Sequence, residues 1–205
     1  MLKIIYRSTV ATVLLASILC GAYPLLVTVV GQVLFHDKAN GGIIKLKDGR
    51  VVGARLIGQA FTQPYYFHGR PSAAGSGSGY DATNSSGSNL GPTNQKLVDT
   101  LQANIDTVLK DNPTLKKGEI PTELVTASAS GLDPHVSPEG AYVQVNRVAQ
   151  ARKATPEQIQ KLVLEHVDGP QWGIFGESVV NVLALNMDLD EQYPVKVLPY
   201  RNVKH

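Results

Sequence analysis

Residues 8–35 read STVATVLLASILCGAYPLLVTVVGQVLF, a run without a single Asp, Glu, Lys, Arg or His. As an α-helix this run would be roughly 42 Å long, because each residue adds about 1.5 Å along the axis. The hydrocarbon core of a bilayer is only about 30 Å thick. The sequence therefore predicts a membrane anchor at residues 1–35, with a span over about residues 8–35.

A cleaved secretory signal is the alternative interpretation of this segment, since Lys3 and Arg7 precede an apolar run here as they would in a signal peptide. Small residues at 20–22 offer a possible cleavage point, but the apolar run continues to Phe35, so cleavage would leave an apolar end. Pro24 is acceptable within a span because neighbouring helices of a complex can satisfy the carbonyl that it frees. We expect an uncleaved single-pass anchor.

The region after the anchor, residues 36–205, is long enough for one domain with its own core. It holds all 17 acidic residues, and only Lys3 and Arg7 of the 19 Lys and Arg residues precede it. The region is therefore formally neutral, which argues against a nucleic-acid or polybasic membrane surface. The single cysteine, Cys20, lies in the span, so we expect neither disulfides nor Cys-ligated zinc in the domain.

Charge alone gives little information on orientation. The basic groups near the two ends of the span are nearly balanced, with the terminal amine, Lys3 and Arg7 on one side and Lys38, Lys45, Lys47 and Arg50 on the other. Long domains translocate largely regardless of charge, and the first segment resembles a signal sequence. We therefore expect residues 36–205 to lie outside the cytoplasm.

The first local signals in this domain are a hairpin and a long loop. Ile43–Lys47 and Arg50–Ile57 flank Asp48-Gly49, a pair that favours the positive φ values of a type I′ turn. Residues 72–94 are dominated by Gly, Ser, Asn and Ala, which cannot bury enough surface to form a core. This stretch is predicted to be a loop, either flexible or held by partners.

Three helices and a short strand are predicted after the loop. The first helix is capped by Thr93 or Asn94 and ends before Pro113, with one apolar face packed inward. A second begins at Ser137-Pro138 and continues past Tyr142, Val145 and Val148. The third has a capping box at Thr155-Pro156-Glu157-Gln158 and is expected to end at Gly169-Pro170. Val179–Leu185 fits either a buried strand or the start of a helix through Gln192. The pattern predicts an α+β fold with a small sheet and about three to four helices.

Catalytic motifs are weak in this sequence. Gly75, Gly77 and Gly79 match neither a phosphate-binding loop nor a dinucleotide fingerprint. His68 follows three aromatic residues, and with no second ligand at binding spacing we expect a hydrogen-bonded structural histidine and no metal site.

Ser128 and Ser130 lie close to Asp133 and His135, yet a G-x-S-x-G elbow is absent. We favour a turn in which these Ser and Asp side chains bond nearby backbone amides. A membrane-anchored extracytoplasmic hydrolase using Ser128 or Ser130, Asp133 and His135 is the alternative function.

Several stretches resemble, in this order, the KdpC family of accessory proteins of the bacterial Kdp-type potassium-transporting P-type ATPase. The resemblance runs from the anchor to about Leu189, and only the loop at residues 74–86 and the tail after Glu191 look particular to this chain. The matching blocks are Tyr23–Leu26, Leu56–Gln59, Phe67–Ala73, Gly87–Gly91, Leu124–Asp133, Arg147–Arg152 and Val179–Leu183.

This resemblance implies a non-catalytic member of a four-subunit, high-affinity potassium uptake pump in the bacterial inner membrane. Its partners would be a channel-like potassium-binding subunit, an ATP-hydrolysing P-type subunit and a small single-helix subunit. ATP and potassium would be handled by the complex, with no cofactor assigned to this chain. The family is described as a catalytic chaperone that raises the ATP affinity of the hydrolytic subunit. From outside the cytoplasm, such an effect must be a coupling free energy transmitted through the membrane subunits.

The segment from Tyr65 to Asn94 holds the candidate partner contacts. A loop this long in a compact domain is usually functional or disordered, and its flanks carry the aromatic residues and the Arg that binding surfaces favour. We expect the flanks to be ordered by packing on each other, the Gly/Ser centre to be mobile, and the segment to face the channel-like subunit. The candidate contact residues are Phe67, His68, Arg70, Asn89 and Asp133.

Overall fold

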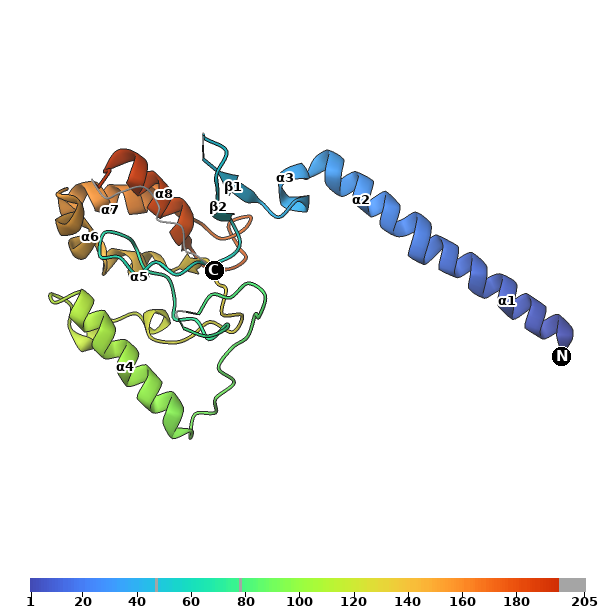
Figure 1. The fold of residues 1–205 in the computed structure, drawn as a ribbon, viewed down its shortest axis with the longest axis horizontal. Helices are drawn as coiled ribbons and strands as arrows, with labels where there is room; N and C mark the ends of the chain where they lie inside the picture. The colour runs from blue at the N-terminus through green and yellow to red at the C-terminus, as the bar shows by residue number, and fades with distance from the viewer. Residues whose placement is uncertain (47, 78, 196–205) are drawn as a thin grey trace. The chain divides into compact units, whose positions relative to one another are not determined.

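The computed structural model describes residues 1–46, 48–77 and 79–195 (Figure 1). Two compact units divide the chain, Met1–Val52 and the unit that begins at Gly53. They are described in turn. The predicted α+β class is confirmed, since an N-terminal apolar helix is followed by small antiparallel sheets and several helices.

The first unit begins with a continuous helix, Leu2–Leu34, that is long and apolar enough to cross a membrane. It includes most of the predicted span at residues 8–35 and comprises α1 (Leu2–Ala16), a π-helical turn (Ser17–Ala22) and α2 (Tyr23–Leu34). The wide turn comes just before Pro24, whose nitrogen carries no hydrogen for the bond to the preceding turn. A π-turn is one of the usual ways in which a helix absorbs such a missing bond.

A short helix, α3 (His36–Ala39), leads to the predicted hairpin, which is confirmed with shorter strands. β1 (Ile43–Lys45) pairs with β2 (Val51–Ala54). The turn differs from the expected two-residue type I′ turn, because the Gly49 N–H donates to the Leu46 carbonyl at 2.9 Å. Gly49 has φ +85°, and the Leu46 N–H donates to the Arg50 carbonyl at 2.9 Å, so the strand pairing closes at Leu46 and Arg50. Lys47 within this loop lies outside the described residues.

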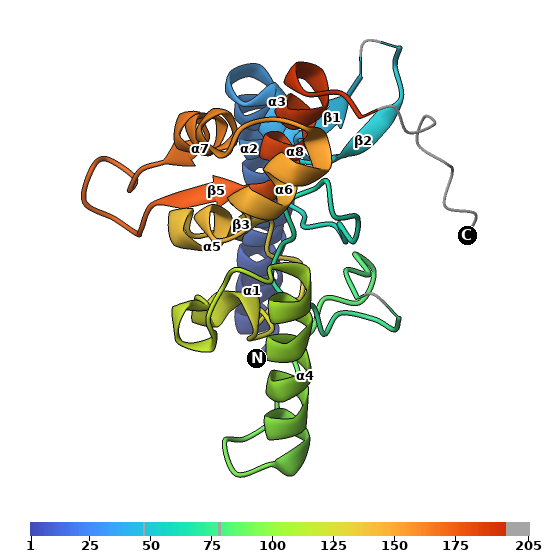
Figure 2. The ribbon, with the colours of Figure 1, turned by 90° about the vertical axis from the view of Figure 1, so that its left-hand side faces the viewer.

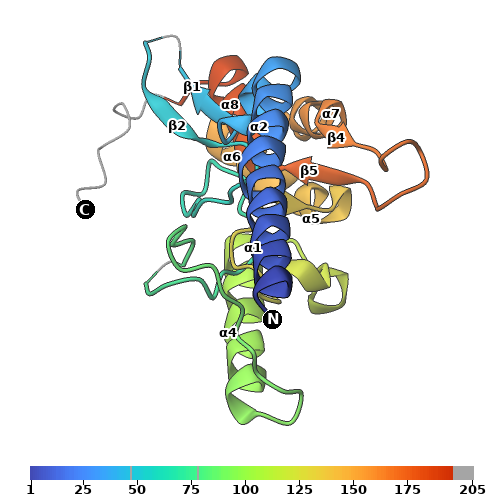
Figure 3. The same ribbon diagram turned by 90° about the vertical axis from the view of Figure 1, so that its right-hand side faces the viewer.

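The second unit contains a three-stranded antiparallel sheet of strand order β3-β5-β4. β3 is His135–Val136, β4 is Val167–Asp168 and β5 is Val179–Asn181. Val180 of the central strand lies opposite Val136 on one side and Val167 on the other. β5 lies between the helices α7 (Pro156–Glu165) and α5 (Pro138–Tyr142) in Figures 2 and 3.

Local capping signals located the helix starts correctly. α4 (Gln95–Asp111) is capped by Asn94, whose Oδ1 accepts the Lys96 N–H at 2.9 Å. The predicted capping box of α7 is present, with Thr155 Oγ1 accepting from the Gln158 N–H at 3.3 Å and Gln158 Oε1 accepting from the Thr155 N–H at 2.9 Å. α7 ends at Glu165, before the expected stop at Gly169, because the chain turns directly into β4.

Two other predictions are revised. The helix that begins at Ser137 is split into α5 and α6 (Val145–Arg152), and at the break the Gln144 side chain donates to the Gly140 carbonyl at 2.9 Å. The ambiguous stretch from Val179 is both structures in succession, β5 and then α8 (Val182–Gln192). Asn181 makes the switch, since its Oδ1 caps α8 by accepting the Ala184 N–H at 3.0 Å.

The hydrophobic core lies among the sheet and the helices α5 to α8. α4 is different, because none of its residues is buried and Val98 is 50% exposed. The inward packing predicted for this helix is therefore only partial, with Val108 half-buried against the core. Two short 3₁₀ turns, Lys117–Glu119 and Thr122–Leu124, follow α4. The principal core residues are Phe67, Val136, Val148, Ile159, Leu162, Val163, Val180, Leu185 and Leu189.

Candidate functional site

The candidate contact segment is held by two buried amide side chains. Asn186 Oδ1 accepts the Phe67 N–H at 2.8 Å, and its Nδ2 donates to the Phe67 carbonyl at 2.9 Å. The Gln144 side chain bonds the backbone of His68 in the same way. Its Oε1 accepts the His68 N–H at 2.8 Å, and its Nε2 donates to the His68 carbonyl at 3.1 Å. Both amides are almost fully buried, and together they satisfy a stretch of backbone that has no strand partner.

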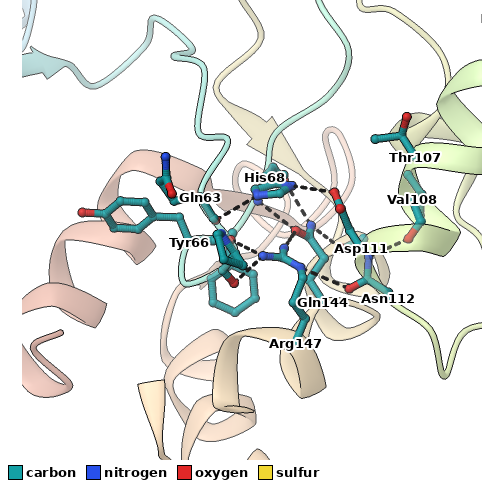
Figure 4. A network of polar contacts seen from close by, with 12 residues as sticks. Gln63, Tyr66, His68, Thr107, Val108, Asp111, Asn112, Gln144 and Arg147 are labelled. Atoms are coloured by element: carbon teal, nitrogen blue, oxygen red, sulfur yellow. Dashed lines mark hydrogen bonds and ion pairs between the residues drawn. The ribbon is translucent and has the colours of Figure 1, made fainter. Parts of the chain in front are cut away.

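Two arginines hold the first residues of this segment, Tyr65 and Tyr66, and Pro64 just before it. Arg147 Nη1 donates to the carbonyls of Pro64 at 2.6 Å and Tyr66 at 2.8 Å (Figure 4). Arg152 Nε donates to the Tyr65 carbonyl at 2.7 Å. Burial lowers the pKa of Arg147 to about 10, with the charge of Asp111 acting in the opposite direction. The guanidinium is still charged at neutral pH, so these bonds are charge-assisted.

The imidazole of His68 connects this segment to α4. Its Nε2 lies 3.0 Å from the Gln63 carbonyl, and its Nδ1 lies 3.8 Å from Asp111 Oδ2 at the end of α4 (Figure 4). Burial lowers the pKa of His68, and the charge of Arg147 adds to this effect. A neutral ring must carry its hydrogen on Nε2 to bond the carbonyl. The predicted hydrogen-bonded role of this histidine is confirmed.

Arg70, two residues after His68, forms a half-buried ion pair with Asp133. Arg70 Nη1 lies 3.1 Å from Asp133 Oδ2, and the side chains are 25% and 29% exposed. The Tyr80 hydroxyl donates to the Arg70 carbonyl at 2.5 Å. Burial and the nearby Asp133 charge together raise the pKa of Tyr80 to about 12, with the Arg70 charge acting in the opposite direction, so the hydroxyl remains a donor. Within the described part of the chain, the buried Nε of Arg70 has no hydrogen-bond partner.

A hollow of about 300 Å³ lies between this segment and α4. Basic, acidic and amide side chains line it together with apolar ones such as Phe61, Val108 and Leu124, so it offers hydrogen-bonding groups as well as apolar surface to a partner. Its polar lining includes Thr62, His68, Arg70, Tyr80, Asn104 and Asp111.

The loop at residues 72–94 is fastened mainly to the segment at 128–132. Ser72 Oγ donates to the Gly131 carbonyl at 2.6 Å, and Ser85 Oγ donates to the Ser130 carbonyl at 2.9 Å. Bonds also cross the loop itself, from Ser86 Oγ to the Ala73 carbonyl at 3.2 Å and from the Asp81 N–H to the Ala74 carbonyl at 3.2 Å. The described residues of the loop form no helix or strand, as predicted. Mobility of its centre stays a prediction, and Ser78 lies outside the described residues.

The structure brings some of the five candidate contact residues together. Arg70 and Asp133 are paired, and His68 lies beside Arg70 on the wall of the hollow. Phe67 is fully buried in the core, so its side chain anchors the segment from inside. Asn89 is exposed at φ +52°, and across the described ranges no hydrogen bond or ion pair joins it to the other four.

The alternative hydrolase site lacks its central contact. Ser130 Oγ accepts the Leu132 N–H at 3.1 Å, the local backbone bond that the sequence predicted. Ser128 is buried, and His135 Nε2 lies 3.4 Å from Asn181 Nδ2. Over the residues that the structure describes, neither serine hydroxyl is bonded to His135, so these groups form no nucleophile and base pair.

The residues that hold the segment were not predicted from the sequence. Gln144, Asn186 and Asp111 match no sequence motif, and Arg147 and Arg152 stand out only as the two ends of one block that resembles the KdpC family. The partners of the two amides lie 76 to 119 positions away in the chain, so no local pattern reveals them. One signal was present, because Gln144 and Arg147 are spaced i and i+3 and therefore share a face of the chain as it enters α6.

The chain is similar to known proteins over nearly its whole length. The family model described as K+-transporting ATPase, c chain (KdpC), matches residues 5–191. The chain belongs to the KdpC family. It is 56% identical over 190 residues to the potassium-transporting ATPase KdpC subunit of Nitratidesulfovibrio vulgaris, covering 93% of this chain and 95% of that protein.

Two further KdpC subunits show the same near-complete coverage. That of Koribacter versatilis is 50% identical, over 95% of this chain and 98% of the relative. That of Paraburkholderia xenovorans is 48% identical, over 93% and 98%. This KdpC family member is accordingly a subunit of a potassium-transporting membrane pump, with one candidate transmembrane helix at its N-terminus.

Proposed function

We propose that this chain is a non-catalytic accessory subunit that stabilises the pump and raises the ATP affinity of the ATP-hydrolysing subunit without contacting ATP. Its membership of the KdpC family supports a role in the complex. The absence of a nucleotide motif from the sequence, and of a nucleophile and base pair from the described serine region, supports the lack of catalysis. We place the domain outside the cytoplasm, at the potassium entry of the channel-like subunit.

The observation that carries the contact surface is the state of Arg70. Its segment is fixed by four buried or half-buried side chains, yet its buried Nε has no partner within the described residues. A buried unsatisfied donor costs about 1–3 kcal/mol, which a partner recovers by supplying an acceptor. A carbonyl or carboxylate of the channel-like subunit that enters the hollow beside His68 and Arg70 would do this once the Arg70 guanidinium turns its Nε toward it.

The other candidate residues take different parts in this proposal. Phe67 supports the surface from the core, whereas Asp133 orients the Arg70 guanidinium through the ion pair. Asn89 is exposed on the same loop and is not part of the lining of the hollow. We propose it as a second contact, independent of the hollow.

An effect on ATP affinity then has to travel through the partner subunits. Coupling free energies between distant sites are typically about 1–3 kcal/mol, which changes affinity about 5- to 150-fold. A docked accessory domain that binds better to the ATP-bound state of the pump supplies such a coupling. The same linkage predicts that ATP tightens the attachment of this subunit.

Arg70→Ala should weaken attachment of the chain to the channel-like subunit and raise the apparent KM of the pump for ATP. The variant removes the donor at the hollow and the ion pair of Asp133 Oδ2 with Arg70. The measurements are copurification of the pump subunits in mild detergent and ATPase activity against ATP concentration.

Arg50→Ala is the matched control, because Arg50 also pairs with an aspartate, Asp48, at 2.6 Å, but with both side chains about half exposed. Such exposed pairs contribute about 0–1 kcal/mol. We expect this variant to assemble and turn over normally. Equal behaviour of the two variants would show that the docking surface lies elsewhere.

A further inference from the structure

The connection between β4 and β5 is a compact hairpin with an apolar tip. Residues 169–176 carry no charge, and Asp168 and Glu177 stand at either end. The Gln171 N–H donates to the Phe175 carbonyl at 2.8 Å, and the Phe175 N–H donates back at 3.0 Å. We call this segment, residues 169–176, the Trp172 hairpin. Figure 3 shows it projecting from the domain beside β5, and Figure 2 shows the same from the other side.

Three large apolar side chains of this hairpin are exposed. Trp172 is 88% exposed, Ile174 is 78% exposed and Phe175 is 61% exposed. The two aromatic rings meet edge to face with centroids 6.0 Å apart, so Trp172 and Phe175 form one continuous apolar surface at the tip. Exposed contiguous apolar groups of this kind mark sites of protein or membrane interaction.

The backbone of the tip is held in an unfavourable conformation. Trp172 has φ +53° and Gly173 has φ +74°, and the Ile174 N–H closes the turn onto the Gln171 carbonyl at 3.2 Å. Positive φ is uncommon for a residue other than glycine, and for a bulky residue it is an outlier. Outliers of this type cluster where function requires a side chain in a fixed position. Here the residue concerned is Trp172, in the turn between Gln171 and Ile174.

We propose that the Trp172 hairpin inserts its tip into the headgroup and hydrocarbon boundary of a lipid bilayer. Tryptophan is the residue that membrane interfaces favour, and the uncharged hairpin leaves its acidic ends in water. The same chain carries the helix Leu2–Leu34, so the domain is tethered at a high effective concentration near a bilayer. A protein interface usually takes some 20 to 30 residues a side, far more than this tip offers.

The lipid requirement follows from the charges. The hairpin has no Lys or Arg, and Asp168 and Glu177 flank it, so anionic headgroups add no attraction. Zwitterionic phosphatidylcholine is therefore expected to suffice. This inference is independent of the pump function and of the side of the membrane that the domain occupies.

Trp172 is the only tryptophan of the chain, so its fluorescence reports on the tip directly. The full chain is reconstituted into phosphatidylcholine vesicles with and without brominated acyl chains. We expect blue-shifted emission, loss of most of it with brominated lipid, and protection from acrylamide. Emission typical of water, with no quenching by brominated lipid, would overturn the proposal. Blue-shifted emission that only the assembled pump produces, without lipid quenching, would assign the tip to a partner subunit instead and would also overturn it.

Two controls make the test specific. Ile174→Ser with Phe175→Ser should lose lipid quenching and regain acrylamide quenching, because the apolar surface beside the indole is gone. A Trp172→Phe chain carrying Lys161→Trp moves the probe to an exposed position of α7, where the native side chain is 78% exposed. Lipid quenching there as strong as at position 172 would contradict a role specific to the hairpin. Lipid quenching of Trp172 that occurs only in vesicles containing anionic phosphatidylglycerol would also contradict the proposal.

Discussion

Replacing Arg152 with Ala is expected to destabilise the domain by about 3 kcal/mol, the lower end of the range for breaking a buried ion pair. The side chain is fully buried. Its pairing partner, Asp190, is 37% exposed and still accepts from the Tyr66 hydroxyl at 2.7 Å, which moderates the loss. The guanidinium bonds the carbonyls of Tyr65, Leu189 and Tyr193 and the carboxylate of Asp190, and lies over the rings of Tyr65 and Tyr66.

The measurement is the free energy of unfolding of the full chain in detergent, followed by near-ultraviolet circular dichroism of the tyrosines. Arg152→Lys should retain only part of the stability, because an ammonium cannot reproduce the fork of donors. Lys161→Ala is the control, since its pair with Glu165 is at 3.8 Å on the exposed face of α7. The free energy of unfolding of this control variant should differ from that of the unsubstituted chain by no more than about 0.5 kcal/mol. An Arg152→Ala chain as stable as this control would refute the stabilising role of Arg152.

Gly131→Ala should detach the loop at residues 72–86 from the segment that holds it. Gly131 has φ +68°, and an added Cβ would lie 2.5 Å from the Ala74 Cβ and 2.6 Å from the Ser86 carbonyl oxygen. Both obstacles belong to the fastened loop, so relief requires the loop to move. We expect a loss above about 2 kcal/mol, which combines backbone strain with the lost contacts. Unfolding free energy and protease cleavage within residues 72–94 measure it.

Gly77→Ala is the matched control within the same loop. Its φ is +71°, close to that of Gly131, but the added Cβ would meet no described atom within 4 Å. Only the backbone cost of about 1–2 kcal/mol applies. Equal losses and equal protease sensitivity for the two variants would mean that crowding at Gly131 does not hold the loop.

Local signals in the sequence were sufficient for the helix starts. Asn94 and the pair Thr155 and Gln158 act on amides two or three residues away, so the pattern that predicts them is contained in a short stretch. The apolar run Val179–Leu185 was ambiguous, because it is rich in β-branched residues and its periodicity does not distinguish a buried strand from the start of a helix through Gln192. The structure resolves it with a strand and a helix that share Asn181 as their junction.

The candidate site could be predicted only as a region. Gln144 and Asn186 are buried, although Gln and Asn are residue types that usually lie at the surface. The residues whose backbone they bond, His68 and Phe67, are far away in the chain. Burial of a polar side chain is tolerated when its hydrogen bonds are made, and only the tertiary fold reveals that. For the same reason Phe67 looked like an exposed contact in the sequence and is a core residue in the structure.

Photo-cross-linking from position 62 tests most directly whether the hollow faces a pump partner. Thr62 is exposed and lines the hollow, and its side chain takes no part in the hydrogen bonds described above that hold the segment. With p-benzoylphenylalanine at position 62, the assembled pump in native membranes should yield a cross-link to the channel-like potassium-binding subunit, whereas the same probe at Lys161 should yield little. A cross-link from position 161 alone, or from position 62 to a cytoplasmic part of the ATP-hydrolysing subunit, would contradict the proposed docking surface and the side of the membrane assigned to the domain.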